Sequence, residues 1–259
     1  MSDATRRKPF GRRRTSAAHG HDDGAAASSG KLQRIGLVGA TGLIGTQLIE
    51  VSSASDVARL VGIARREITM PPGARMEMFV AQTEKWGEVL AAVRPRALIC
   101  ALGTTWRKAG KSKTGFRAVD QDLIVETARI AHAAGVSNMV LVSAAGADAE
   151  SKNFYMQVKG ETEALVSGIG FKRLDILRPG LLRGQREGDF RTMERLALAL
   201  GPLVEPLLPA KWDMYRSIEA RVVAEAALGL SLRRAGGRFT HDNQAMLRAA
   251  REWRAKEEG

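Results

Sequence analysis

Short apolar runs alternate with longer amphipathic segments from residue 31 onward, and this alternation decides the fold that we expect. The apolar runs predict strands at 34–39, 59–64, 76–81, 97–102, 138–143 and 174–177. They are almost continuously apolar, which is typical of parallel strands that are covered on both faces. Between them, apolar residues recur at helical spacing in 42–53, 84–93, 116–134 and 153–168. This order predicts an α/β fold with a doubly wound parallel sheet.

The alternation ends after Pro179, so we expect only a small helical extension beyond the sheet. Helices are predicted at 189–200 and 218–232, with an irregular segment at 202–209. Residues 233–259 are expected to be a polar C-terminal tail, which could be helical from 248 to 256. Only a small region is therefore left to cover a ligand.

The composition narrows the class of protein. Of 259 residues, 44% are apolar, which is enough for a core. The net charge of +12 comes from basic residues spread along the chain without aromatic interleaving, so we expect no nucleic-acid partner. No uninterrupted apolar run reaches the roughly 18 residues that a membrane span requires, so no span is expected. The histidines lack ligand neighbours at metal-binding spacing, so no metal site is expected either.

The single cysteine and the N-terminal segment bear on the compartment. Cys100 lies within an apolar run, which indicates a buried structural thiol in a reducing environment. Residues 1–30 are basic and poor in large apolar side chains, so we expect a disordered basic tail. Their composition also resembles a mitochondrial presequence, but Asp22, Asp23 and the missing amphipathic pattern argue against one. We expect a cytoplasmic protein.

A glycine-rich turn joins the first predicted strand to the first predicted helix. Its glycines are Gly39, Gly42 and Gly45, each three residues apart. The first allows a tight turn, the second lets the backbone approach a diphosphate at the helix N-terminus, and the third lets the helix pack closely on the strand. An ordinary tight turn is the alternative, but the preceding strand and the following helix favour a dinucleotide site in a Rossmann fold.

The end of the second predicted strand indicates which dinucleotide is bound. An acidic residue at this place binds the ribose 2′-hydroxyl of NAD. Arg65 and Arg66 occupy it here, and guanidinium groups form charge-assisted bonds with the 2′-phosphate of NADP. We therefore expect NADP (NADPH) rather than NAD, with a pair of ordinary surface arginines as the alternative.

A tyrosine, a lysine and a serine are placed for proton transfer. Tyr155 and Lys159 are four residues apart, so on a helix they share one face. A nearby ammonium lowers the pKa of a phenol, whose usual value of about 10 is too high for acid–base work at neutral pH. Ser143 ends a predicted strand and could hold a substrate carbonyl. These three are the predicted catalytic residues, at the edge of the sheet where α/β folds bind ligands.

The motifs, taken together, resemble a known family. The chain is similar to the atypical short-chain dehydrogenases of the Tat-interacting-protein oxidoreductase group, which are related to NAD-dependent epimerases and dehydratases. The resemblance runs from about residue 34 to 182 and rests on motifs in order: Gly39-Ala-Thr-Gly-Leu-Ile-Gly45, Cys100-Ala-Leu-Gly-Thr-Thr105, Val119-Asp120, Leu141-Val-Ser143, Tyr155-Met-Gln-Val-Lys159 and Leu177-Arg-Pro-Gly180.

The resemblance adds residues to the expected cofactor site. It implies that NADPH is also held by Thr41, Leu43, Ile44, Leu102, Gly103, Thr104 and Pro179, besides the glycines and arginines above. Many relatives carry an asparagine where Asp120 stands, which puts a proton relay through this residue in doubt. Trp106, which follows the Gly103 turn, either lines the substrate site or is an ordinary loop aromatic.

We therefore expect residues 31–232 to form an NAD(P)-binding Rossmann domain with a small substrate-side region. The predicted function is NADPH-dependent oxidoreduction of an unidentified small carbonyl or hydroxyl compound. The alternative is a regulatory or assembly protein that binds NADPH with little turnover and acts through a protein partner. A homodimer is left open.

Overall fold

Seven parallel strands form one sheet in the computed structural model, which describes residues 32–184 and 216–258. The strands are β1 (Gln33–Val38), β2 (Ala58–Ala64), β3 (Glu77–Val80), β4 (Ala97–Cys100), β5 (Asn138–Val142), β6 (Arg173–Leu177) and β9 (Gly237–His241), in the spatial order β3-β2-β1-β4-β5-β6-β9. The chain runs outward from β1 to β3 and then returns to the other side of β1 at β4. This reversal places a topological switch point beside the carboxyl end of β1, where such folds bind ligands.

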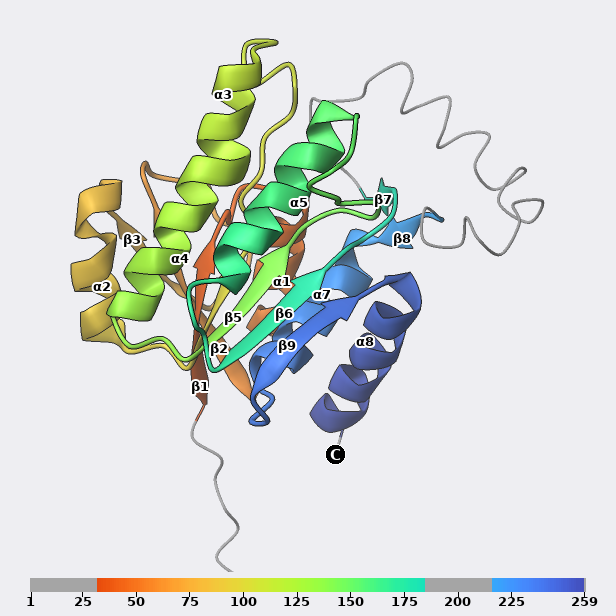
Figure 1. Cartoon of the computed structure of the whole chain (residues 1–259). Helices are drawn as coiled ribbons and strands as arrows, with labels where there is room; N and C mark the ends of the chain where they lie inside the picture. Colours follow the sequence, from red (N-terminus) through yellow and green to blue (C-terminus); the bar gives the residue numbers. More distant parts are fainter. Residues whose placement is uncertain (1–31, 185–215, 259) are drawn as a thin grey trace, which may run out of the picture. The chain divides into compact units, whose positions relative to one another are not determined.

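Helices cover both faces of the sheet (Figure 1). The helices are α1 (Leu43–Ser53), α2 (Trp86–Val93), α3 (Lys113–Arg117), α4 (Ile124–Ala133), α5 (Phe154–Ser167), α7 (Ala220–Ser231) and α8 (Asn243–Glu257). One apolar core lies between the sheet and α1, α7 and α8, and a second lies between the sheet and α2 and α4. The expected doubly wound α/β fold is confirmed.

The helix predicted over 116–134 is divided into three segments. The chain forms α3, then a π-helical segment at Ala118–Leu123, then α4. A short 3₁₀ turn, Thr83–Lys85, likewise precedes α2. π-helical turns re-aim side chains and are frequent at functional sites. Here the π-helical segment contains the buried Asp120.

The expectation of a polar tail after residue 232 is wrong, although the helix allowed at 248–256 lies within α8. Residues 237–241 form β9, which pairs with β6, and residues 243–257 form α8, which packs on α7. β9 is an edge strand with mostly exposed side chains, so its sequence lacks the apolar run of a central strand. In α8 the buried Met246, Ala249, Ala250 and Trp253 recur at helical spacing among charged residues.

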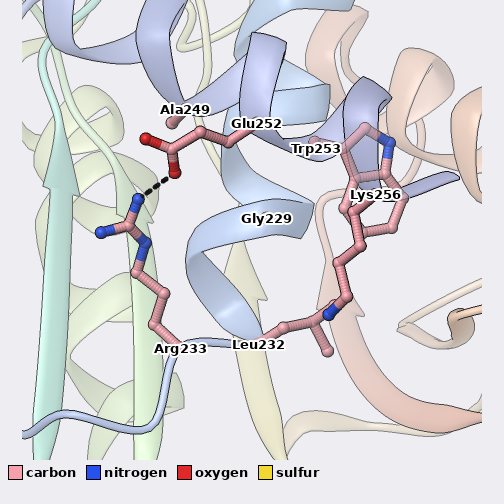
Figure 2. Close-up of a pocket in the computed structure, with 7 residues that line it drawn as sticks. All are labelled: Gly229, Leu232, Arg233, Ala249, Glu252, Trp253 and Lys256. Atoms are coloured by element: carbon pink, nitrogen blue, oxygen red, sulfur yellow. Dashed lines mark hydrogen bonds and ion pairs between the residues drawn. The ribbon is translucent and has the colours of Figure 1, made fainter. Parts of the chain in front are cut away.

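A small cavity lies between the C-terminal ends of α7 and α8 (Figure 2). It measures about 200 Å³ and is lined by Gly229, Leu232, Arg233, Ala249, Glu252, Trp253 and Lys256. Arg233 and Glu252 form an ion pair across its mouth. Because α7 and α8 run antiparallel to the strands, this cavity lies at the amino end of the sheet, away from the ligand edge.

The remaining expected elements have mixed outcomes. The helix expected at 218–232 begins at Ala220, because Ile218–Glu219 forms β8 and pairs with β7, Leu182–Arg183. The predicted basic tail, the helix at 189–200 and the irregular segment at 202–209 lie outside the described residues. The helices described in 32–184 and 216–258 include none that is long and apolar enough to cross a membrane.

Candidate functional site

The turn between β1 and α1 has the shape of a phosphate cradle. Gly39 has a φ of +90°, and a Cβ there would lie 2.4 Å from the carbonyl carbon of Ala101. A Cβ on Gly45 would lie only 2.1 Å from the carbonyl oxygen of Gly39. Side chains larger than hydrogen are therefore excluded at both positions unless the backbone moves. These contacts hold the first turn of α1 directly against the end of β1.

The N-terminus of α1 is open to an anion. Gly42 is the N-cap residue, has no side chain to cap the helix, and its own amide donates to Gly39. The first turn contains no acidic side chain. The amides of Leu43 and Ile44 lie at this terminus, where backbone N–H groups and the helix dipole favour a phosphate. Thr41 is exposed on the same turn. These residues fit the diphosphate of a dinucleotide.

Arg65 and Arg66 directly follow β2, the strand that lies between β1 and β3 in the sheet. Arg65 and Arg66 are both exposed. Neither guanidinium forms an ion pair with another residue in the described ranges. Both are therefore available to an incoming phosphate, and their selection of NADP stays a prediction.

The other predicted cofactor residues lie at the carboxyl ends of β4 and β6. The loop Leu102–Thr104 follows β4 by one residue. That residue, Ala101, donates its amide hydrogen to the Val38 carbonyl oxygen of β1 at 2.9 Å. The carbonyl oxygen of Pro179 accepts the amide of Ala145 at 2.9 Å, which ties the end of β6 to the end of β5. The structure therefore brings these loops to the same edge of the sheet as the glycine cradle.

A buried ion pair lies beside the predicted catalytic tyrosine. The Lys159 Nζ is 2.8 Å from Asp120 Oδ1, and both residues are at most 5% exposed. Asp120 Oδ2 accepts the Thr104 amide at 2.7 Å. The Lys159 Nζ is 6.0 Å from the ring centroid of Tyr155, whose side chain is 40% exposed. The partly exposed phenol of Tyr155 therefore lies near the Lys159 ammonium, which is held in place by its ion pair with Asp120.

The Lys159 ammonium is kept charged despite its burial. Burial acts to lower the pKa of Lys159, but the Asp120 carboxylate and Tyr155 outweigh this effect, and the pKa is raised above its ordinary value. Asp120 thus keeps Lys159 charged. The sequence pattern did not assign this role, because only the folded structure shows that Asp120 pairs with Lys159.

Ser143 is bonded to a different pair of side chains. It is buried, and its hydroxyl donates a hydrogen bond to the Glu163 carboxylate. The Arg178 Nη2 lies 2.6 Å from Glu163 Oε2. No hydrogen bond joins Ser143 to Tyr155 within the described part of the chain. The structure thus brings Tyr155 and Lys159 together, whereas the Ser143 hydrogen is turned toward Glu163.

Sequence reasoning missed Glu163 and Arg178. A signal was present, because Glu163 lies four residues after Lys159 on the same helix, and Arg178 stands in the quoted Leu-Arg-Pro-Gly motif. Cys100 also lies near this site and is fully buried. Burial raises the pKa of its thiol to about 11, so it has little thiolate character at neutral pH.

Comparison with known proteins identifies the family. A family model described as NAD(P)H-binding matches residues 39–201, which include the cradle, both arginines, the tyrosine and the lysine. This chain belongs to the NAD(P)H-binding family. It is 35% identical over 217 residues to the protein fmp52, mitochondrial, of Emericella nidulans, covering 80% of this chain and 90% of that protein. It is 32% identical over 221 residues to the protein HTATIP2 of Rattus norvegicus, covering 83% and 88%.

The similarity to HTATIP2 confirms the resemblance to the Tat-interacting group. Solved structures extend it at the level of the fold. A UDP-glucose 4-epimerase with UDP-glucose from Thermotoga maritima has a TM-score of 0.62 at 12% identity, covering 85% of this chain and 82% of that chain. MoeE5 in complex with UDP-glucose and NAD has a TM-score of 0.60 at 15% identity, covering 81% and 76%. The architecture of the NAD(P)H-binding family is therefore shared with epimerase-like proteins.

Proposed function

We propose that this member of the NAD(P)H-binding family is an NADPH-dependent oxidoreductase of the atypical short-chain dehydrogenase type. One observation carries the proposal: an exposed phenol, Tyr155, lies beside the buried and charged Lys159 at the sheet edge that bears the glycine cradle. A proton donor, a charge that stabilises its conjugate base and a dinucleotide site are thereby combined in one place.

In this proposal the side chains transfer one proton and stabilise the phenolate that its loss leaves behind. NADPH, when bound, supplies a hydride to a carbonyl carbon. Tyr155 donates its phenolic proton to the carbonyl oxygen, and the Lys159 ammonium stabilises the phenolate that remains. Asp120 holds Lys159 charged and in position. Tyr155 and Lys159 are the proposed catalytic residues, and Asp120 is a positioning residue.

The orientation of Ser143 narrows its proposed role. Because its hydrogen goes to Glu163, the oxygen offers only lone pairs to a ligand. This suits the hydroxyl of an alcohol substrate better than a carbonyl oxygen, which needs a donor. When a carbonyl is reduced, Tyr155 is therefore the main hydrogen-bond donor that polarises it.

The test of catalysis is Tyr155→Phe. We expect NADPH oxidation with a panel of aldehydes and ketones to fall by at least about 100-fold, because general acid catalysis contributes on the order of 10²–10⁴ in rate. NADPH affinity should stay within about twofold, since the phenol is not part of the cradle. Turnover that survives the substitution unchanged would show that Tyr155 is not the acid.

The preference for NADPH is proposed from Arg65 and Arg66. Arg65→Ala should weaken NADPH by about tenfold and leave NADH unchanged, because one charge-assisted contact to the 2′-phosphate is lost. Arg59→Ala is the matched control, since Arg59 is an exposed arginine at the other end of β2. Equal affinities of the parent protein for NADPH and NADH would contradict the proposal.

The second candidate function is a regulatory or assembly protein that binds NADPH with little turnover. The observation that favours it is the engaged Ser143 hydroxyl, followed by Ala144, which leaves a substrate carbonyl without a serine donor. Tight NADPH binding by the parent protein, no turnover over the panel and a stable partner on co-purification would support this candidate over the first.

We keep the cytoplasm as the proposed location of the protein, and this proposal is tested separately. The fungal relatives carry the word mitochondrial in their names, whereas the sequence led us to expect the cytoplasm. Residues 1–30 are the basic segment that could direct a mitochondrial location. A fluorescent fusion of the full chain, compared with one that lacks residues 1–30, tests the cytoplasmic expectation; mitochondrial fluorescence of the full chain alone would overturn it.

A further inference from the structure

An aromatic cluster extends from the proposed acid to the surface. Tyr155 and Phe116 have ring centroids 5.6 Å apart, Phe116 and Phe154 are 5.9 Å apart, and Phe154 and Trp106 are 6.3 Å apart. Phe116 is buried beneath the others, whereas Trp106 and Tyr155 are 41% and 40% exposed. We call Trp106, Phe154 and Tyr155 the aromatic surface. It combines the proposed reactive group with large apolar side chains that remain accessible.

The loop that carries Trp106 is held in one conformation by its own backbone. The amide of Lys111 donates to the carbonyl oxygen of Trp106 at 2.8 Å, and the amide of Ala109 donates to Thr105 at 2.9 Å. A Cβ on Gly115 would lie 2.5 Å from the Ala109 carbonyl oxygen, so the loop packs closely on α3. An exposed tryptophan on a preorganised loop loses little entropy when it binds a ligand.

The aromatic surface is bordered by positive charge. Residues 105–117 include five basic side chains and no acidic one. Arg117 is paired with Glu161, but Lys111 and Lys113 are exposed and have no carboxylate partner in the described ranges. The Lys113 Nζ lies over the Phe154 ring, 5.3 Å from its centroid, and the Arg117 Cζ lies over the same ring at 5.6 Å. A ligand that rests on the aromatic surface would therefore have an ammonium close to one end.

We propose that the aromatic surface binds the substrate, and that the substrate is a carbonyl compound with a flat aromatic body and a carboxylate. The reacting group would lie at Tyr155, the aromatic body against Trp106 and the edge of Phe154, and the carboxylate at Lys113, with Lys111 adding to the attraction. This rests on the proposed function and goes beyond it by naming the class of substrate. Trp106 and Lys113 become specificity-determining residues.

Three aldehydes separate the two parts of the proposal. The compound para-formylbenzoate has the ring and the charge, para-methylbenzaldehyde has only the ring, and succinic semialdehyde has only the charge. With NADPH, we expect para-formylbenzoate to show the lowest KM. Trp106→Ala should raise KM for both aromatic aldehydes by about tenfold and for succinic semialdehyde by less than about twofold. Trp106→Phe should restore most of the loss.

Lys113→Ala tests the charge. It should raise KM by about five- to tenfold for para-formylbenzoate alone, and Lys113→Arg should retain the parent value. Lys172→Ala is the matched control, because Lys172 is an exposed lysine next to the amino end of β6. Equal KM values for the charged and neutral aromatic aldehydes in the parent, or a loss of NADPH affinity in Lys113→Ala, would overturn the proposal.

Binding without turnover distinguishes this inference from the proposed function. Calorimetric titration of 2-naphthoate into the NADP-saturated protein should give a signal that Trp106→Ala and Lys113→Ala each weaken by about fivefold or more. If no aldehyde turns over but naphthoate binds in this way, the oxidoreductase proposal fails and the assignment of the surface stands. If naphthoate does not bind, or binds equally to all variants, the surface is not a ligand site.

Discussion

Gly45→Ala is expected to impair cofactor binding far more than a one-carbon change normally would. The new Cβ would lie 2.1 Å from the Gly39 carbonyl oxygen and 2.8 Å from two backbone atoms of Ala40. Since carbon and oxygen pack at about 3.4 Å or more, α1 must move away from β1 by on the order of 1 Å. All the obstructing atoms are backbone atoms, so no side chain can rotate to relieve the overlap.

The displacement affects stability and binding differently. Alanine favours the helix over glycine by roughly 0.5–1 kcal/mol, and overpacking typically costs about 1–3 kcal/mol, so we expect a net loss of about 1–2 kcal/mol. Hydrogen bonds to a charged group contribute about 1.5–3 kcal/mol each, and a 1 Å shift misaligns the amides that would reach the diphosphate. NADPH affinity should therefore fall by at least about tenfold.

Two measurements check this expectation. Urea unfolding gives the stability, and the change in NADPH fluorescence on titration gives the affinity. Gly87→Ala is the matched control, because Gly87 lies in α2 and a Cβ there meets only the Ile130 Cγ2 at 3.6 Å. It should be neutral or slightly stabilising with unchanged affinity. If Gly45→Ala binds NADPH as tightly as the parent at an unchanged urea midpoint, the cradle does not depend on this contact and the reasoning is refuted.

Three further changes probe the rest of the site and the C-terminal region. Asp120→Asn removes the carboxylate that most strongly opposes the effect of burial on Lys159, so the pKa of Lys159 should fall and the alkaline limb of the rate against pH should move to lower pH; an unmoved limb would contradict the assigned charge balance. Glu163→Gln removes the carboxylate that pairs with Arg178 and should lower the free energy of unfolding in urea by about 1–3 kcal/mol. The double variant Glu163→Gln/Arg178→Gln should recover part of this loss. If the single variant is as stable as the parent, the pair is energetically neutral. Trp253→Ala should cost about 3–5 kcal/mol by the same assay, because the side chain is 3% exposed, whereas a solvated tail would show no change.

The central half of the fold could be predicted because several signals agree there. The apolar run of β1, the glycine spacing and the amphipathic pattern of α1 are all local in sequence, and each independently indicates the same strand–turn–helix unit. The strands β2, β4, β5 and β6 are buried on both faces, so their composition alone distinguishes them. Their boundaries differ from the predicted ones by one or two residues.

What could not be predicted depends on contacts between distant residues. β9 is an edge strand and needs a partner on one side only, so the sequence Gly-Arg-Phe-Thr-His contains no apolar run. The interrupted helix contains Asp120, whose partners Lys159 and Thr104 lie 39 and 16 residues away in the chain, so the local sequence pattern does not reveal these contacts. The direction of the Ser143 hydroxyl depends on Glu163, and side-chain rotamers of this kind leave no periodic signal.

β9 and α8 follow all the other described strands and helices in the sequence, which constrains how the protein can fold while it is being made. A nascent chain that has not yet reached residue 237 lacks the outermost strand and the helix that shields the apolar side of α7. All the other described strands and helices are synthesised before that surface can be buried, so the emerging polypeptide must pass through a stage with exposed apolar area. A ribosome stalled before residue 237 should therefore display a chain that is sensitive to proteases and binds holdase chaperones, and one that has released residues 237–257 should not.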